Sequence, residues 1–87
     1  SNKRQSLPEQ MGKAPKGSDI SPVSHLRFRK MLECQNREDL FPLLRRMIRK
    51  LDKKVDIYHL ADDLYWWGDR RKREWAHDYY AHAPAPQ

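Results

Sequence analysis

One stretch decides the fold of this chain: Leu64-Tyr65-Trp66-Trp67-Gly68-Asp69-Arg70-Arg71-Lys72-Arg73-Glu74-Trp75. It holds all three tryptophans of the sequence, a central glycine and a run of four cations. Large aromatic side chains favour burial, whereas clustered cations favour water or phosphate. The stretch therefore predicts a corner between core and surface, where one helix ends at Trp66-Trp67 and the next is capped by Asp69. Gly68 is predicted to stop the first helix in the left-handed conformation.

The three tryptophans are predicted to have different roles. Trp67 and Trp75 fall on the apolar stripes of their helices, so we expect both in the core. Trp66 lies off its stripe and is expected at the surface. It either stacks on an unpaired base or packs against a partner subunit, and the partner is the preferred interpretation.

Working outward from this corner, apolar residues recur at the spacing of amphipathic helices. Ser24 is predicted to cap the first long helix, with Ser21-Pro22 as an alternative start one turn earlier. A residue between Asn36 and Asp39 is predicted to cap the second, and Asp56 the third. The predicted buried faces are Phe28, Met31 and Leu32; Leu40, Phe41, Leu44, Met47, Ile48 and Leu51; Ile57, Leu60, Ala61, Leu64 and Trp67; and Trp75, Ala76 and Tyr79.

These patterns predict an all-α fold, a small bundle of three to four helices over residues 23–83, with a loose tail at 84–87. Prolines, glycines and cations are interspersed in residues 1–22, which is typical of a flexible basic arm. One short helical turn is possible there, from Leu7 to Met11. The arm either touches nucleic acid or serves as a plain linker.

Composition narrows the class of partner. The net charge of +6 and the pI near 9.7 favour an anionic partner, nucleic acid before an acidic membrane or protein. A single cysteine, Cys34, excludes an internal disulfide and fits a reducing cytoplasm. No apolar run approaches the roughly 18 residues of a membrane span, so no membrane association is expected.

Cations gather in two places, and both predict contacts to a nucleic-acid backbone. In the second long helix, Arg46, Arg49 and Lys53 follow one stripe beside Arg45. After Gly68, cations occupy a helix start, where the helix dipole disfavours them and a phosphate would favour them. The two groups are expected to form one continuous surface; the alternative is a solvated helix face. The predicted contacts are Arg27, Arg45, Arg46, Arg49, Lys53, Arg70, Arg71 and Arg73.

Two groups of residues could suggest metal chemistry. His59, Asp62 and Asp63 share one helical face, and His77-Asp78 is similar to the metal dyad of some phosphohydrolases. Neither has the further ligands that such sites need, so we expect no metal, no cofactor and no catalytic residue. A surface acid patch is the preferred interpretation, and it could pair with arginines of a neighbour.

Several motifs together resemble a known family. They are Arg45-Arg46 in an apolar helix, Val55-Asp56, Trp66-Trp67-Gly68 followed by cations, Tyr79-Tyr80, and upstream Leu7 to Gly12 and Ile20-Ser21-Pro22 to Leu32. In order and spacing they resemble the carboxy-terminal half of the CasB small subunit of the type I-E CRISPR surveillance complex, Cascade. The resemblance implies that this chain represents that half, without the family's additional amino-terminal helical domain.

The resemblance also implies a function. It implies a non-catalytic subunit in antiviral defence that binds nucleic acid without reading sequence, stabilising guide RNA with its target strand and the displaced DNA strand. Other Cascade subunits and a second copy of the chain are the implied protein partners. Arg46 matches a basic position of the family, and Arg70 and Lys72 fall near two others. Arg37 lies near a further basic position, so it is added to the predicted contacts. Asp69 and Glu33 are acidic at positions where the family commonly has basic residues. A helical protein-interaction scaffold that does not bind nucleic acid is the alternative.

Overall fold

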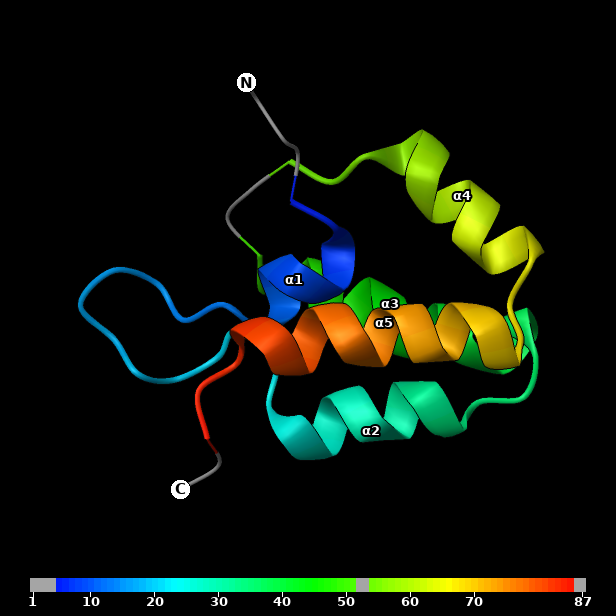
Figure 1. The fold of residues 1–87 in the computed structure, drawn as a ribbon. Coiled ribbons are helices and arrows are strands. Elements are labelled where there is room, and N and C mark those ends of the chain that lie inside the picture. Colours follow the sequence, from blue (N-terminus) through cyan, green and yellow to red (C-terminus); the bar gives the residue numbers. More distant parts are fainter. Residues whose placement is uncertain (1–4, 52–53, 86–87) are drawn as a thin grey trace.

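The computed structural model describes residues 5–51 and 54–85. Over these residues the chain forms five helices and no strand: α1 (Leu7–Gly12), α2 (His25–Glu33), α3 (Arg37–Ile48), α4 (Ile57–Tyr65) and α5 (Asp69–His82) (Figure 1). The predicted all-α class and the four longer helices are confirmed, and the short turn predicted near Leu7 is a fifth helix. None of the helices described is long and apolar enough to cross a membrane.

Side-chain caps start three of the helices as predicted. The amide of Arg27 donates to Ser24 Oγ at 3.2 Å, and that of Asp39 donates to Asn36 Oδ1 at 2.9 Å. The amide of His59 donates to Asp56 Oδ1 at 3.1 Å. Each cap satisfies an amide that has no partner within its own helix, so these three boundaries follow from local sequence.

The corner at Gly68 differs from the prediction. Helix α4 ends at Tyr65, and Gly68 has φ 172° and ψ −169°, an extended conformation that any residue adopts. Asp69 is the first residue of α5 and provides no side-chain cap. The predicted left-handed cap is therefore wrong. Trp67 holds the corner instead, since its Nε1 donates to the Cys34 carbonyl at 2.9 Å and its ring packs edge-on against Trp75.

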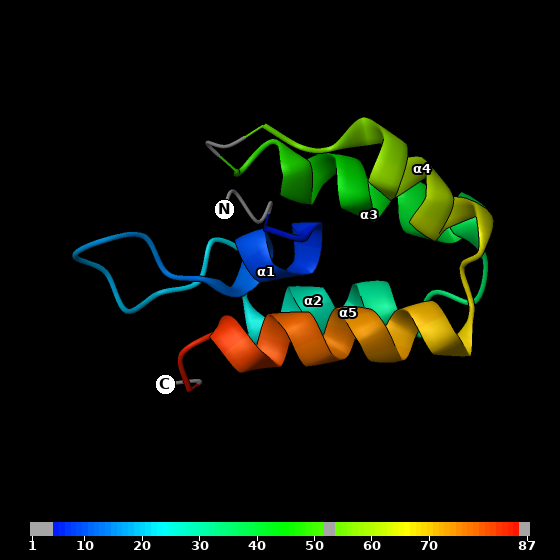
Figure 2. The ribbon, with the colours of Figure 1, turned by 45° about the horizontal axis from the view of Figure 1, so that its top comes forward.

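The helices form two layers (Figure 2). Helices α2 and α5 lie side by side in one layer, α3 and α4 lie in the other, and α1 sits between the layers at one end. Helices α2 and α5 run antiparallel, because His25 contacts the Pro84 carbonyl at 2.9 Å at one end while Trp67 bonds to Cys34 at the other. The start of α2 therefore lies beside the end of α5, and the end of α2 lies beside the start of α5.

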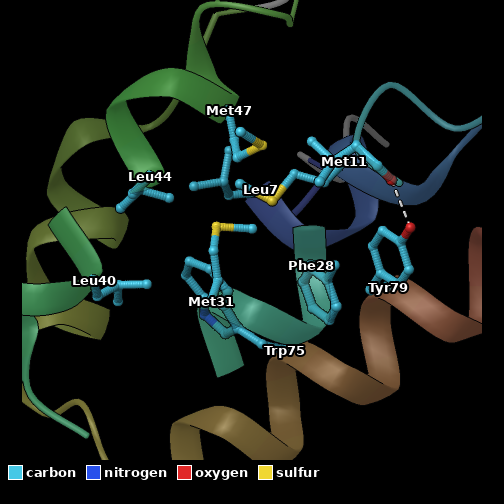
Figure 3. Close-up of a cluster of buried hydrophobic side chains, with 10 residues drawn as sticks. Leu7, Met11, Phe28, Met31, Leu40, Leu44, Met47, Trp75 and Tyr79 are labelled. Atoms are coloured by element: carbon cyan, nitrogen blue, oxygen red, sulfur yellow. Dashed lines mark hydrogen bonds between the residues drawn. The ribbon is translucent and has the colours of Figure 1, made fainter. Parts of the chain in front are cut away.

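The core draws side chains from α1, α2, α3 and α5 (Figure 3). The rings of Phe28 and Tyr79 stack at 3.9 Å, and Met31, Leu44 and Trp75 are almost completely buried around them. The Tyr79 hydroxyl donates to the Val23 carbonyl at 2.5 Å. Most of the predicted buried faces are thus confirmed.

Helix α1 belongs to this core, so the prediction of a flexible arm over residues 1–22 is wrong for Leu7–Gly12. Met11 is fully buried, and its carbonyl accepts a hydrogen bond from the Val23 amide at 3.1 Å. Gly12 lies against α5, where a Cβ atom would sit 2.7 Å from the Tyr79 carbonyl oxygen. Only a glycine allows this approach. The exposed loop 15–20 is what remains of the predicted arm among the described residues.

Two predicted core positions of α4, and one of α3, are exposed. Ile57 is 71% exposed and Ala61 is exposed, whereas Leu60 and Leu64 are partly buried against the core. Phe41 is 49% exposed. The apolar residues of α4 extend around more of its circumference than one neighbouring layer can cover, so part of that face is left outward. At the end of α4, Tyr65 and the following Trp66 extend this outward apolar surface, and Trp66 is 63% exposed.

Candidate nucleic-acid interface

A basic groove lies between α2 and α3. Arg27 and Lys30 project from α2, and Arg46 projects from α3, with Lys50 just after that helix; these four cations border a hollow of about 410 Å³. All four residues are exposed. Positions 27 and 30 lie one turn apart on α2, so both face the groove. Arg46, in the last turn of α3, and Lys50, just after that helix, border it from the other side.

The floor of this groove is apolar. Leu43 lines the hollow as a partly buried side chain, and Met31 from α2 and Met47 from α3, which also border it, are core residues only 0% and 6% exposed. These residues are the inward stripe of each helix, and they reach the groove because α2 packs against α3. The groove therefore combines a positively charged rim with a floor that offers no charged group.

A second basic hollow adjoins the first. It measures about 560 Å³ and is lined by Lys13 and Lys16 of the loop after α1, and by Lys50, which the two hollows share. No acidic residue lines either hollow within the described part of the chain. We call this surface the basic track; its cations are Lys13, Lys16, Arg27, Lys30, Arg46 and Lys50.

The cations of the track are free to meet a ligand. Among residues 5–51 and 54–85, no ion pair or side-chain hydrogen bond engages any of the six. Arg45 and Arg49 are also exposed on α3 but do not line either hollow. Lys53, another predicted contact, lies outside the described residues.

The cations after Gly68 lie apart from the track. Arg70 and Arg73 are exposed on α5, beyond the corner that Trp67 fixes to Cys34 at the end of α2. Arg27 lies toward the other end of α2, about 10 Å from Cys34 along the helix axis at 1.5 Å per residue. Arg46 borders the groove beside Arg27, whereas α5 starts near Cys34. The prediction that the cations after Gly68 form one continuous surface with Arg46 is therefore wrong.

Arg71 is engaged within the protein and is not part of an open basic surface. Its side chain is 19% exposed and lies 3.0 Å from Asp62, 3.1 Å from Asp63 and 3.0 Å from Glu74. Burial lowers the pKa of Arg71, but hydrogen bonds to Glu74 and Asp62 raise it more, so the charge is held firmly. Arg71 is therefore removed from the proposed contacts.

The acid patch predicted on α4 is engaged by residues of α5. Asp63 is buried and accepts a 2.9 Å hydrogen bond from Trp75 Nε1, and it shares Arg71 with Asp62. The predicted patch thus pairs with an arginine of its own chain. Within the described residues, no group of three or more His, Cys, Asp or Glu side chains is placed to hold a metal ion.

Arg37 also has partners within the fold. Its Nη1 donates to the Tyr65 carbonyl at 3.3 Å, and its guanidinium lies 5.6 Å from the centre of the Tyr65 ring. These contacts join the start of α3 to the end of α4. The side chain is still 55% exposed, but it lies at the end of the bundle away from the track.

Comparison with known families identifies the chain. The family model described as CRISPR-associated protein Cse2 matches residues 1–80. The chain belongs to the Cse2 family. Cse2, or CasB, is the small subunit of type I-E Cascade and a non-catalytic structural subunit, so the resemblance seen in the sequence is confirmed. No curated protein and no solved structure matches the chain.

For this Cse2-family chain, the sequence patterns led to only part of the track. Arg27 and Arg46 were among the predicted contacts. Lys13 and Lys16 lie in the predicted arm, for which contact with nucleic acid was one of two interpretations, whereas Lys30 and Lys50 were not predicted contacts. The spacing of Lys30 from Arg27 and of Lys50 from Arg46 is visible in the sequence. What the sequence did not reveal is that the packing of α2 against α3 makes these two pairs face one another across a groove.

Proposed function

We propose that this chain binds nucleic acid along the basic track, without reading sequence, as the small subunit's contribution to holding the strands of type I-E Cascade. The observation that carries the proposal is a pair of adjoining hollows with six cations for which the described residues supply neither an ion-pair partner nor an acidic lining. Under this proposal the chain works in the cytoplasm beside other Cascade subunits and stabilises guide RNA with its target or the displaced DNA strand.

The chemistry of the track suits a phosphate backbone. Each cation that meets a phosphate releases condensed counterions, which gives affinity that depends on salt and not on base identity. Arg27 and Arg46 face each other across the groove, and a guanidinium binds phosphate through two parallel hydrogen bonds. Arg45 and Arg49 extend the proposed contact along α3, and Arg70 and Arg73 form a separate proposed contact at the start of α5. Lys53, which lies outside the described residues, stays a proposed contact from the sequence alone.

The test is a salt titration of oligonucleotide affinity. For a single strand, each phosphate contact contributes about 0.7 to the slope of log K against log salt. The double variant Arg46→Ala/Lys50→Ala should therefore reduce the slope by about 1.4 and weaken all sequences alike.

A matched double variant separates the track from net charge. Arg29→Ala/Lys54→Ala removes the same charge from two exposed cations outside both hollows. It should reduce the slope much less than the track variant. Equal losses for the two doubles would mean that only net charge matters, and a wild-type affinity that ignores salt would exclude the electrostatic mechanism.

A second candidate function rests on the outward face of α4. Tyr58 is 90% exposed, and Ile57, Tyr65 and Trp66 lie exposed near it on α4 and just beyond its end. Exposed apolar groups in this number are typical of a protein interface. As a scaffold module, the chain would capture a second copy or another Cascade subunit through this face. Tyr58→Ser/Trp66→Ser should then abolish association in sedimentation while leaving oligonucleotide affinity unchanged.

A further inference from the structure

The interface between α2 and α3 is built differently from the other interfaces of α3 and α4. Trp75 of α5 is tied to Asp63 of α4 by a 2.9 Å hydrogen bond, and Arg37 of α3 is tied to the Tyr65 carbonyl of α4 at 3.3 Å. Among residues 5–51 and 54–85, no hydrogen bond or ion pair joins α2 to α3. Apolar packing in the core holds these two helices together.

The same interface carries like charges on both sides. Arg27 and Lys30 of α2 border a hollow of about 410 Å³ opposite Arg46 and Lys50, and no acidic residue of the described chain lines that hollow. Like charges repel, and at about 0.1 M salt the repulsion is largely screened only beyond a Debye length of about 10 Å. In the free protein these four cations therefore oppose the packing of α2 against α3.

A phosphate group is the ligand chemistry that reverses this effect. We infer that one phosphate held at once by Arg27 of α2 and Arg46 of α3 supplies the polar link between the two helices, so that filling the groove stabilises the fold. The inference rests on the proposed function, whose ligand carries phosphates, and adds a coupling between binding and stability. A guanidinium suits the role because its planar fork donates two parallel hydrogen bonds to phosphate oxygens.

Stability without ligand tests the repulsion. Arg46→Gln/Lys50→Gln removes two charges from the groove and keeps much of each aliphatic stem, so the full chain should melt about 2–4 °C above the wild type in about 0.1 M NaCl. The gain should vanish in about 1 M NaCl, where the Debye length is about 3 Å. The matched control, Arg29→Gln/Lys54→Gln, removes the same charge from exposed positions outside the groove and should gain less. A groove variant that melts no higher than this control in the lower salt would overturn the repulsion.

A double-mutant cycle tests the link itself. The affinity of the full chain for tripolyphosphate and for oligothymidylate is measured after Arg27→Gln, after Arg46→Gln and after both changes. Each single change should weaken binding about tenfold, and the double change should weaken it well under about a hundredfold, because the two arginines share one phosphate. Arg27→Gln with Lys16→Gln is the control pair, since Lys16 lines the adjoining hollow, and its two losses should multiply.

The outcomes separate the link from the proposed function. If the losses at Arg27 and Arg46 multiply as fully as those of the control pair, the shared phosphate is overturned, while oligothymidylate binding that weakens with each change leaves the proposed function intact. Non-additive losses for tripolyphosphate, with no binding of oligothymidylate, would support the link, assign the groove to free phosphate compounds and remove the proposed function. Failure of both probes to bind would overturn both.

Discussion

Trp75 donates the hydrogen of its indole Nε1 to Asp63 Oδ2 at 2.9 Å, joining the middle of α5 to α4 inside the protein. The other carboxylate oxygen of Asp63 lies 3.1 Å from Arg71 Nε. One buried carboxylate thus has two partners on the same helix. It explains why α4 stays attached at its carboxyl-terminal half although much of its surface faces outward.

Asp63→Ala should destabilise the fold by about 3 kcal/mol, because it leaves the buried indole N–H without a partner and removes an anion beside Arg71. Urea unfolding measures the change. Asp62→Ala is the control: its side chain is 56% exposed, and loss of its ion pair should cost at most about 1 kcal/mol. Similar losses for both variants would show that the buried position of Asp63 contributes nothing.

Gly12→Ala should destabilise the fold by about 1–3 kcal/mol, because the new Cβ would lie 2.7 Å from the Tyr79 carbonyl oxygen and α1 would have to move from α5. Thermal unfolding measures the change in melting temperature.

Gly68→Ala should instead be neutral or stabilising by about 0.4–1 kcal/mol, since the backbone of Gly68 is extended and the new Cβ would lie 3.9 Å from the Trp66 carbonyl oxygen. Marked destabilisation by Gly68→Ala would instead support a left-handed conformation of Gly68, as the sequence predicted.

Alkaline pH should weaken the fold through Tyr79. Burial raises the pKa of the Tyr79 hydroxyl, and Tyr80 raises it further, whereas a hydrogen bond with Ser21 lowers it. A pKa raised by folding means that the contribution is complete below the unfolded value of about 10 and is lost as pH rises through the folded value. Tyr79→Phe should cost about 1 kcal/mol at neutral pH and flatten the alkaline decline in stability.

The control for this pH effect is Tyr58→Phe. Tyr58 is 90% exposed, so replacing it removes a tyrosine hydroxyl that the fold does not bury. Stability measured by urea unfolding at pH values on either side of about 10 distinguishes the two tyrosines. An alkaline decline that persists unchanged in Tyr79→Phe would assign it to another group.

Arg70→Ala/Arg73→Ala should affect binding differently from changes in the track. Because these two cations lie at the other end of the α2–α5 pair, an oligonucleotide just long enough to cover the track should bind the double variant as it binds the wild type. A longer strand should lose salt dependence with either double variant. Equal loss on the short strand would show that the two groups form one surface after all.

Much of the secondary structure could be predicted from local chemistry. Ser24, Asn36 and Asp56 start their helices because each supplies a side-chain oxygen to an amide that the helix leaves unpaired. Trp75 and Tyr79 are buried because they share one stripe of α5. Gly68 was misjudged because a glycine after a helix permits the left-handed cap without requiring it, and the Trp67 bond to Cys34 fixes the corner in another way.

The sequence by itself determined the helical class, the caps of α2, α3 and α4, the positive charge and the Cse2 family, because each depends on residues close together in the chain or on their order. Tertiary structure alone decided which cations are available. It buried α1 against α5 through Gly12, enclosed Arg71 between carboxylates of α4 and α5, and set Arg27 across a groove from Arg46. Whether a cation faces solvent, an acid or another cation depends on packing between helices, which no single helical period specifies.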